Sequence, residues 1–102
     1  MTYYQVFISA ESQEQAASIL NALLEERLVL GGPILEGPAQ FWWKGERIEM
    51  SYAYFLTYTK QTRKNRVIDI ASAASKEEVP MISLIPFEGN PELLKLIDET
   101  VV

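Results

Sequence analysis

The basic residues of this chain are concentrated at one point, which makes that point the first candidate for binding chemistry. Four of the nine Lys and Arg residues stand within seven positions: Lys60, Arg63, Lys64 and Arg66. A helix is expected to begin among them, where the helix dipole and free N–H groups attract anions. We therefore predict that these four residues bind a small anionic ligand. The alternative is a solvated helix face whose screened charges bind nothing.

Two pairs of adjacent carboxylates, Glu25-Glu26 and Glu77-Glu78, are the candidates for cation binding. Hard cations such as Mg²⁺ and Ca²⁺ take oxygen ligands, but dedicated sites space those ligands along a loop, and neither pair has that spacing. We assign both pairs to the surface and predict no metal site.

Residue types that many enzymes need are absent. The chain has no Cys and no His, which removes thiolate nucleophiles, imidazole bases and the preferred ligands of zinc and copper. An acylphosphatase-like hydrolase would need an Arg in a phosphate-cradling loop, and nothing between Ile8 and Ser12 resembles one. We predict no catalytic residue, no cofactor and no enzyme activity.

Charge and length limit the class of protein further. A formal net charge of −5 repels phosphate backbones and anionic lipids, so we expect neither nucleic-acid nor membrane binding. The 102 residues fit one domain that spans 1–102. Because Met1-Thr2-Tyr3-Tyr4 lacks a basic segment before an apolar stretch, we expect a cytoplasmic protein.

The elements that position these residues follow from the hydrophobic pattern. Tyr3 to Ser9 is rich in β-branched and aromatic residues on both faces, which predicts a buried central strand. Ser12 followed by Gln15 resembles a capping box, so a helix is predicted from near Ser12. Its apolar stripe has helical spacing and consists of Ala16, Ile19, Leu20, Leu23 and Leu24.

A long hairpin is predicted in the middle of the chain. Leu28–Leu35 is expected to form an irregular second strand, because Gly31-Gly32-Pro33 interrupts it. Phe41–Ile48 contains a strand end, a Gly-containing turn that extends through Glu46-Arg47, and a return strand. From Ile48 to Tyr58 one face is apolar and the other mostly polar, which is typical of a strand.

Two helices and a strand complete the pattern. After Lys60 a helix is predicted, with Thr62 as its N-cap and an end before Lys76. Val79–Pro86 is the fourth strand, and Asn90-Pro91 opens the last helix. The order is strand, helix, strand, strand, helix, strand, with one extra helix. This predicts an α+β ferredoxin-like fold, a split βαβ with a four-stranded antiparallel sheet.

Aromatic residues of the hairpin are candidates for an interface. Trp42 and Trp43 point to opposite faces of a strand, so one of them must lie at the surface or between subunits. Tyr52, Tyr54 and Tyr58 resemble the stacking strand of RNA-recognition motifs, but the basic residue and glycine that this motif requires are missing. We predict a homotrimer instead. The predicted interface residues are Trp42, Trp43, Tyr52 and Tyr54.

Four short motifs, in order along nearly the whole chain, resemble the CutA divalent-ion-tolerance family. They are Ala22-Leu23-Leu24-Glu25-Glu26-Arg27-Leu28, Phe41-Trp42-Trp43-Lys44-Gly45, Glu78-Val79-Pro80 and Gly89-Asn90-Pro91-Glu92-Leu93-Leu94. The resemblance implies a ferredoxin-like subunit, a homotrimer joined through long hairpins, and a role in copper or divalent-ion tolerance.

The chain departs from this family at the residues that would bind soft metals. Gly31 stands at the family's cysteine position, and the family's His-Pro-Tyr-Glu-Val-Pro-Glu segment reads Ser75-Lys76-Glu77-Glu78-Val79-Pro80-Met81. We expect a trimeric binding or regulatory protein without tight copper or zinc binding. The alternatives are a PII-like signalling trimer that senses an anion and an acylphosphatase-like hydrolase.

Overall fold

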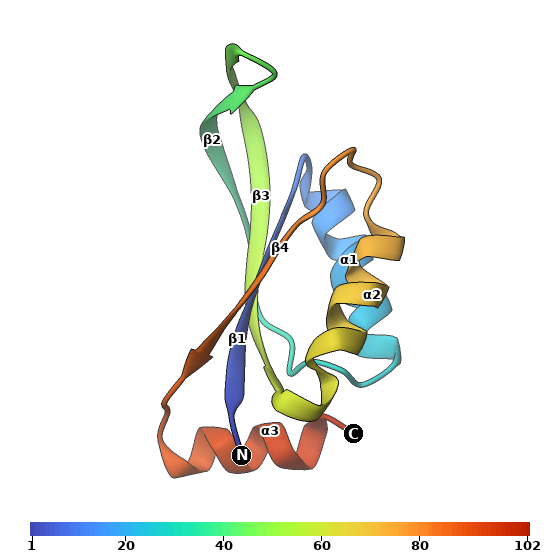
Figure 1. Ribbon diagram of the computed structural model, residues 1–102, viewed down its shortest axis with the longest axis vertical. Coiled ribbons are helices and arrows are strands. Elements are labelled where there is room, and N and C mark those ends of the chain that lie inside the picture. The colour runs from blue at the N-terminus through green and yellow to red at the C-terminus, as the bar shows by residue number, and fades with distance from the viewer.

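Four strands and three α-helices follow one another in the order expected from the sequence (Figure 1). The structure is a computed structural model that describes residues 1–102. The strands are β1 (Tyr3–Ala10), β2 (Ile34–Trp43), β3 (Glu46–Lys60) and β4 (Met81–Phe87). The helices are α1 (Gln13–Glu25), the 3₁₀ helix η1 (Gln61–Arg63), α2 (Lys64–Ala74) and α3 (Pro91–Thr100).

One antiparallel sheet with the strand order β2-β3-β1-β4 forms the centre of the molecule. The crossovers place α1 and α2 side by side on one face of this sheet (Figure 1). α3 lies across the end opposite the hairpin tip. This is the split βαβ arrangement of the ferredoxin-like α+β fold, so the predicted fold class is confirmed.

Side chains from one face of the sheet form the core against α1 and α2. Val6, Ile8 and Phe55 are fully buried, and Ile19 and Leu23 of α1 belong to the same cluster. Successive residues of a strand point to opposite faces, so the intervening residues of β1 and β3 point away from the helices. The core is therefore one-sided.

The hairpin of β2 and β3 extends beyond the two helices (Figure 1). It closes through Lys44 and Gly45, whose φ angles of 51° and 83° are both positive. Two such residues in succession match the twist of the flanking strands, as in a type I′ turn. The longer turn predicted through Glu46-Arg47 is wrong, because these residues already pair in the ladder of β3 with β2.

The regular part of the second strand begins later than the sequence indicates. Leu28–Leu30 lies outside it, and the backbone N–H and carbonyl of Gly31 bond to the Thr57 hydroxyl at 2.8 and 3.0 Å. A Cβ at Gly32 would lie 2.7 Å from the carbonyl oxygen of Leu56. Only glycine allows this close approach, after which regular pairing begins.

Local signals set the start of α1 but not that of α2. The Ser12 hydroxyl accepts a hydrogen bond from the Gln15 N–H at 3.1 Å, which confirms the predicted N-cap. The Gln15 side chain does not complete a capping box, since it accepts from the Lys76 N–H at 3.3 Å. Thr62 is not the cap of α2: it lies within η1, and Arg63 precedes the helix without a side-chain cap.

The last helix begins where the sequence predicts, and the last strand begins two residues later than predicted. Asn90 precedes α3 and Pro91 opens it, as predicted, although the Asn90 side chain donates to Glu92 instead of capping the helix. β4 begins at Met81, two residues after the predicted Val79, because the intervening proline has no N–H to donate to the ladder. None of the helices is long and apolar enough to cross a membrane.

Candidate functional site

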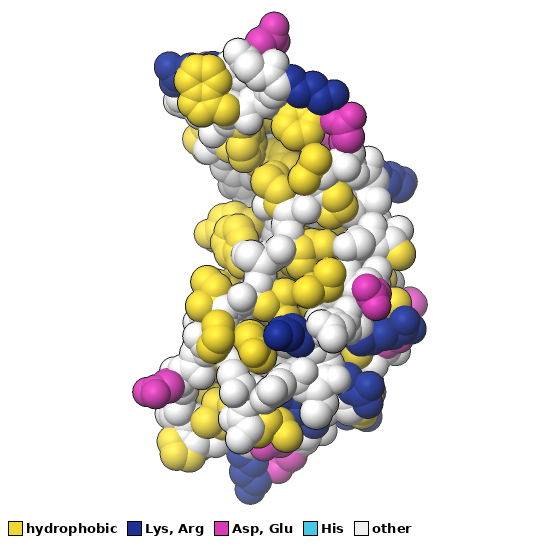
Figure 2. Space-filling view, viewed as in Figure 1, with side chains coloured by type: hydrophobic (Ala, Val, Ile, Leu, Met, Phe, Trp, Pro, Cys, Tyr) yellow, Lys and Arg dark blue, Asp and Glu magenta, His cyan; other side chains and the backbone are white.

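The sheet face that points away from α1 and α2 is apolar and uncovered. Phe7 and Tyr54 are 37% and 38% exposed, and their rings stack with centroids 5.0 Å apart. Leu35 and Ile85, on the outer strands, are 47% and 56% exposed. The strand register places all four on this face. Figure 2 shows hydrophobic side chains running along the sheet from the hairpin towards α3.

Further aromatic pairs extend this open face in both directions. The rings of Phe41 and Tyr52 meet edge to face at 4.8 Å, and those of Tyr58 and Phe87 lie 5.1 Å apart. Contiguous exposed apolar surface of this kind marks a site of contact with another protein or a ligand.

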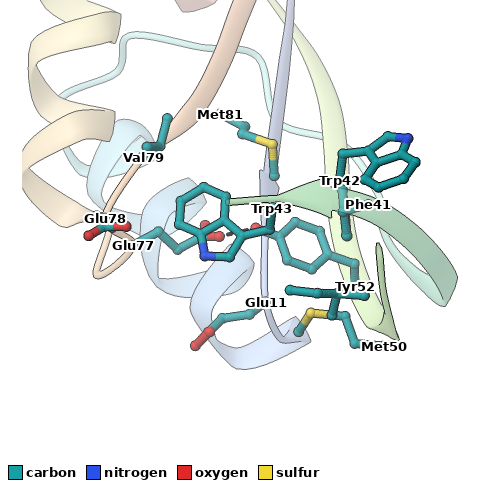
Figure 3. Close-up of a pocket in the computed structure, with 11 residues that line it drawn as sticks. Glu11, Phe41, Trp42, Trp43, Met50, Tyr52, Glu77, Glu78, Val79 and Met81 are labelled. Atoms are coloured by element: carbon teal, nitrogen blue, oxygen red, sulfur yellow. Dashed lines mark hydrogen bonds between the residues drawn. The ribbon is translucent and has the colours of Figure 1, made fainter. Parts of the chain in front are cut away.

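The four predicted interface residues lie on the hairpin, but they do not share one environment. Trp42 is 75% exposed and points away from the other aromatic side chains, whereas Trp43 points towards Glu77 (Figure 3). Tyr54 lies on the open face, and Tyr52 is half-buried against the loop between α2 and β4. The opposite orientations of the two tryptophans agree with the sequence prediction. Their place at a trimer interface stays a prediction.

A pocket of about 440 Å³ lies between the hairpin and the loop that precedes β4 (Figure 3). The rings of Phe41, Trp43 and Tyr52 form its aromatic wall, and Trp42 borders the pocket with its ring pointing away (Figure 3). Four aliphatic side chains, Ile48, Met50, Val79 and Met81, complete the apolar lining. The only charged residues in the lining are Glu11, Glu77 and Glu78. The pocket is therefore apolar and aromatic with acidic residues at one side.

Glu77 is the polar residue that points towards the aromatic rings (Figure 3). Its Oε1 accepts a hydrogen bond from the Tyr52 hydroxyl, while its Oε2 is buried and has no hydrogen-bond partner. Burial, and to a lesser extent the negative charge of Glu11, raise the pKa of the Glu77 carboxyl. The prediction that Glu77 is a surface acid holds only in part, because the residue is half-buried and Tyr52, from a distant part of the sequence, contacts its carboxylate.

Lys44 of the hairpin turn spans the rim of the pocket. Its Nζ lies 3.0 Å from a carboxylate oxygen of Glu78 and 5.4 Å from the centroid of the Trp43 ring. Both charged side chains of the ion pair are largely exposed, so this contact adds at most about 1 kcal/mol. It connects the hairpin tip to the loop before β4.

Met81 lines the pocket, because β4 begins with it on the open face. No three acidic residues lie close enough together to hold a metal ion. The pocket itself was missed in the sequence. Its only signal was the pair of adjacent tryptophans before a Gly-containing turn.

The basic cluster lies where β3 passes into α2, and three of its four members already have a partner within the chain. Arg66 forms an ion pair with Glu26 at 2.8 Å, and the Arg63 guanidinium donates to the Val102 carbonyl. Lys64 lies 5.1 Å from the ring centroid of Tyr4. Lys60 is the N-cap residue of η1, and its side chain makes no capping hydrogen bond. The structure gathers these residues at one end of α2, and their anion binding stays a prediction.

Residues 4–100 of the chain match the model of the CutA1 divalent ion tolerance protein family. The chain belongs to the CutA1 family. It is 33% identical over 97 residues to the divalent-cation tolerance protein CutA of Archaeoglobus fulgidus, covering 94% of this chain and 95% of the relative. The predicted family is thereby confirmed.

Solved CutA structures share the fold of this CutA1 family member. The periplasmic divalent cation tolerance protein CutA from Archaeoglobus fulgidus superposes with a TM-score of 0.90 at 31% identity, covering 98% of this chain and 99% of the other. The divalent cation tolerance protein from Thermus thermophilus gives 0.84 at 28% identity, over 98% and 99% of the two chains.

Gly31 and Ser75 stand where the resemblance implied a cysteine and a histidine. The backbone N–H and carbonyl of Gly31 bond to the Thr57 hydroxyl. Ser75 follows α2, and its hydroxyl accepts a hydrogen bond from the Glu77 N–H at 3.3 Å. Neither residue offers a soft metal ligand.

Proposed function

We propose that this CutA1 chain is a non-catalytic homotrimer that acts in divalent-cation tolerance as an assembled protein. The exposed apolar face of the sheet is the observation that best supports the proposed trimer. Phe7, Leu35, Tyr54 and Ile85 leave apolar surface in water that a second layer would bury, and no helix of the chain covers it. Burial of apolar area is worth about 25 cal/mol per Å², so packing of these faces on one another favours association.

The hairpin supports the same arrangement. It projects beyond the body of the subunit (Figure 1). Trp42 and Trp43, on its opposite faces, are both exposed, and Lys44 and Glu46 lie at or beside its turn. A projecting hairpin cannot bury both of its faces against its own chain. A neighbouring subunit would cover the side that carries Trp42, which is why we keep the predicted interface residues in this proposal.

The role in cation tolerance would not depend on a tight copper or zinc site within one subunit. The chain lacks Cys and His, and its carboxylates do not gather into a three-ligand cluster. Carboxylates prefer hard cations, so any ion that the assembly binds through them would be held more weakly than by thiolate or imidazole. Neither the hydrolase nor the signalling trimer gains support from the site, and we do not propose them.

Sedimentation of the untagged protein at micromolar concentration tests the assembly. We expect the mass of three chains, and dissociation when Tyr54→Glu places a charge on the open face. Ile68→Glu is the matched control, since Ile68 is 39% exposed on α2 and lies outside this face. A stable monomer, or equal dissociation by both variants, would count against the proposal. The tolerance role is tested by comparing the growth of a host strain that lacks this protein with the growth of the parent strain as the Cu²⁺ or Zn²⁺ concentration rises. Equal growth of the two strains would count against the role.

A further inference from the structure

The pocket between the hairpin and the loop before β4 has a lining that is complementary to a cation bearing apolar groups. Every charged residue in the lining is a carboxylate, and no Lys or Arg is among the lining residues. The faces of aromatic rings carry a negative quadrupole and attract cations within about 6 Å of the ring centroid. Aromatic walls with acidic residues therefore favour a positively charged ligand over a neutral or anionic one.

Glu77 supplies a half-buried carboxylate to this pocket. One of its oxygens accepts from Tyr52, and the other is buried without a donor. An unpaired buried acceptor is costly, and a cation beside it would offset that cost. Figure 3 shows the Glu77 side chain directed towards Trp43 and Tyr52, whereas the Glu11 and Glu78 carboxylates point outwards. The charged end of a ligand would thus lie between Glu77 and Trp43.

Lys44 provides an internal example of this attraction. Its ammonium lies 5.4 Å from the centroid of the Trp43 ring while it pairs with Glu78 at the exposed rim. The same ring and the same loop already hold a cation of this chain. Because Lys44 is an exposed side chain on a turn, it can move aside without disturbing the core.

Two other kinds of cation fit the pocket less well. A metal ion needs several converging oxygen ligands, and no group of three acidic residues provides them. The primary ammonium of Lys44 lies at the exposed rim, where Glu78 and water supply acceptors for its three N–H donors. Deeper in the pocket, the lining offers only one buried unpaired oxygen. A quaternary ammonium presents methyl groups that need no acceptor and pack on aromatic rings.

We propose that this pocket binds a small quaternary ammonium ion, whose charge lies on the Trp43 ring beside Glu77. The inference goes beyond divalent-cation tolerance and does not require the trimer. Of the other possible occupants, a side chain from a second copy of this chain is the main competitor, because the pocket adjoins the open face of the sheet.

Choline is a suitable probe, and 3,3-dimethyl-1-butanol is its uncharged isostere. The chain has two tryptophans, so Trp42→Phe leaves Trp43 as the reporter. In this variant we expect choline to change Trp43 emission in a saturable way and the isostere to leave it unchanged. Glu77→Gln in the same background should weaken choline binding about tenfold, the effect expected for a carboxylate in a partly desolvated site. Glu49→Gln removes one charge from the same hairpin outside the pocket and should leave the affinity unchanged.

Three results would overturn the proposal. No saturable response to choline would show that the pocket takes no such ion, provided that circular dichroism shows the variant folded. Equal binding of choline and the neutral isostere would show that the pocket binds by apolar contacts and does not select a cation. A choline response that appears only after Tyr54→Glu dissociates the assembly would show that a second copy of the chain fills the pocket.

Discussion

The hydroxyl of Tyr52, on β3, donates a hydrogen bond to Oε1 of Glu77, 25 residues further along the chain in the loop between α2 and β4. This contact fastens the base of the projecting hairpin to the body of the subunit. It also holds the Glu77 carboxylate where its second oxygen is out of reach of water. The protonation state of one side chain thus bears on both the pocket and the stability of the fold.

We expect Glu77→Gln to raise the melting temperature at neutral pH. Burial, and secondly the charge of Glu11, raise the pKa of the Glu77 carboxyl above its usual value of 4.5. A group with a raised pKa in the folded chain contributes stability below its unfolded pKa and loses it as pH rises through the folded pKa. Gln removes the buried charge and keeps an oxygen that can accept from Tyr52.

Thermal unfolding at pH values from about 4 to about 7 measures this effect. The difference between Glu77→Gln and the unmodified chain should be largest at neutral pH and small at the acid end. Glu49→Gln, at an exposed position, should show no such dependence. A melting temperature that falls at neutral pH would mean that the ionised carboxylate is stabilised in the fold, contrary to this argument.

Thr57→Val should destabilise the chain by about 1–3 kcal/mol, the cost of leaving buried polar groups without partners. The fully buried Thr57 hydroxyl both accepts from the Gly31 N–H and donates to its carbonyl. Valine has the same shape but neither function. Urea unfolding checks the prediction, with the exposed Thr62→Val as the control. Equal stability of both variants would show that water replaces the hydroxyl.

Gly45→Ala should destabilise the hairpin by about 1–2 kcal/mol, since a residue with a Cβ is strained at positive φ. The φ angle of Gly45 is 83°, and no atom lies near its missing Cβ, so the cost would come from the backbone alone. Gly37→Ala is a matched control, because Gly37 has open space and no positive φ. Urea unfolding should therefore separate the two variants, and identical curves would refute the turn argument.

Titration with Cu²⁺ and Zn²⁺ should reveal no submicromolar, stoichiometric site in the untagged protein. Without Cys or His, the available ligands are carboxylates, carbonyls and Met thioethers, which hold these ions weakly. Isothermal calorimetry measures this directly. A tight site that disappears when two or fewer residues are changed would contradict the expectation, and three copies that bring carboxylates together would be the way to build it.

The basic cluster at the start of α2 is expected to bind an anion through Arg63 and Lys64, with an affinity that falls as salt rises. Calorimetry with sulfate, nucleotides and polyphosphate, compared with the Arg63→Ala plus Lys64→Ala variant, tests this prediction. The partners that Arg63 and Arg66 already have within the chain would compete with such a ligand. If the double variant binds the anion as well as the unmodified chain does, the cluster is a solvated helix face and not the binding site.

The sequence by itself determined the elements, their order and the family. Alternation in β1 and β3, the stripe of α1 and the Ser12 cap are local signals, because each depends on neighbours within a few residues. The boundaries that failed were those without such a signal. Thr62 was predicted to cap α2, but it lies in η1, which precedes that helix. The hairpin turn was predicted to extend to Arg47, but positive φ angles at Lys44 and Gly45 close it within two residues.

Only the tertiary structure decided where the functional surfaces lie. Glu77 looked like one of two ordinary surface acids until the fold placed Tyr52 against it. In the same way, alternation alone could say that Trp42 and Trp43 diverge, but not which of them would face the loop before β4. Contacts between residues far apart in sequence depend on how the crossovers pack and how the hairpin twists, and no local pattern of residue types encodes that geometry.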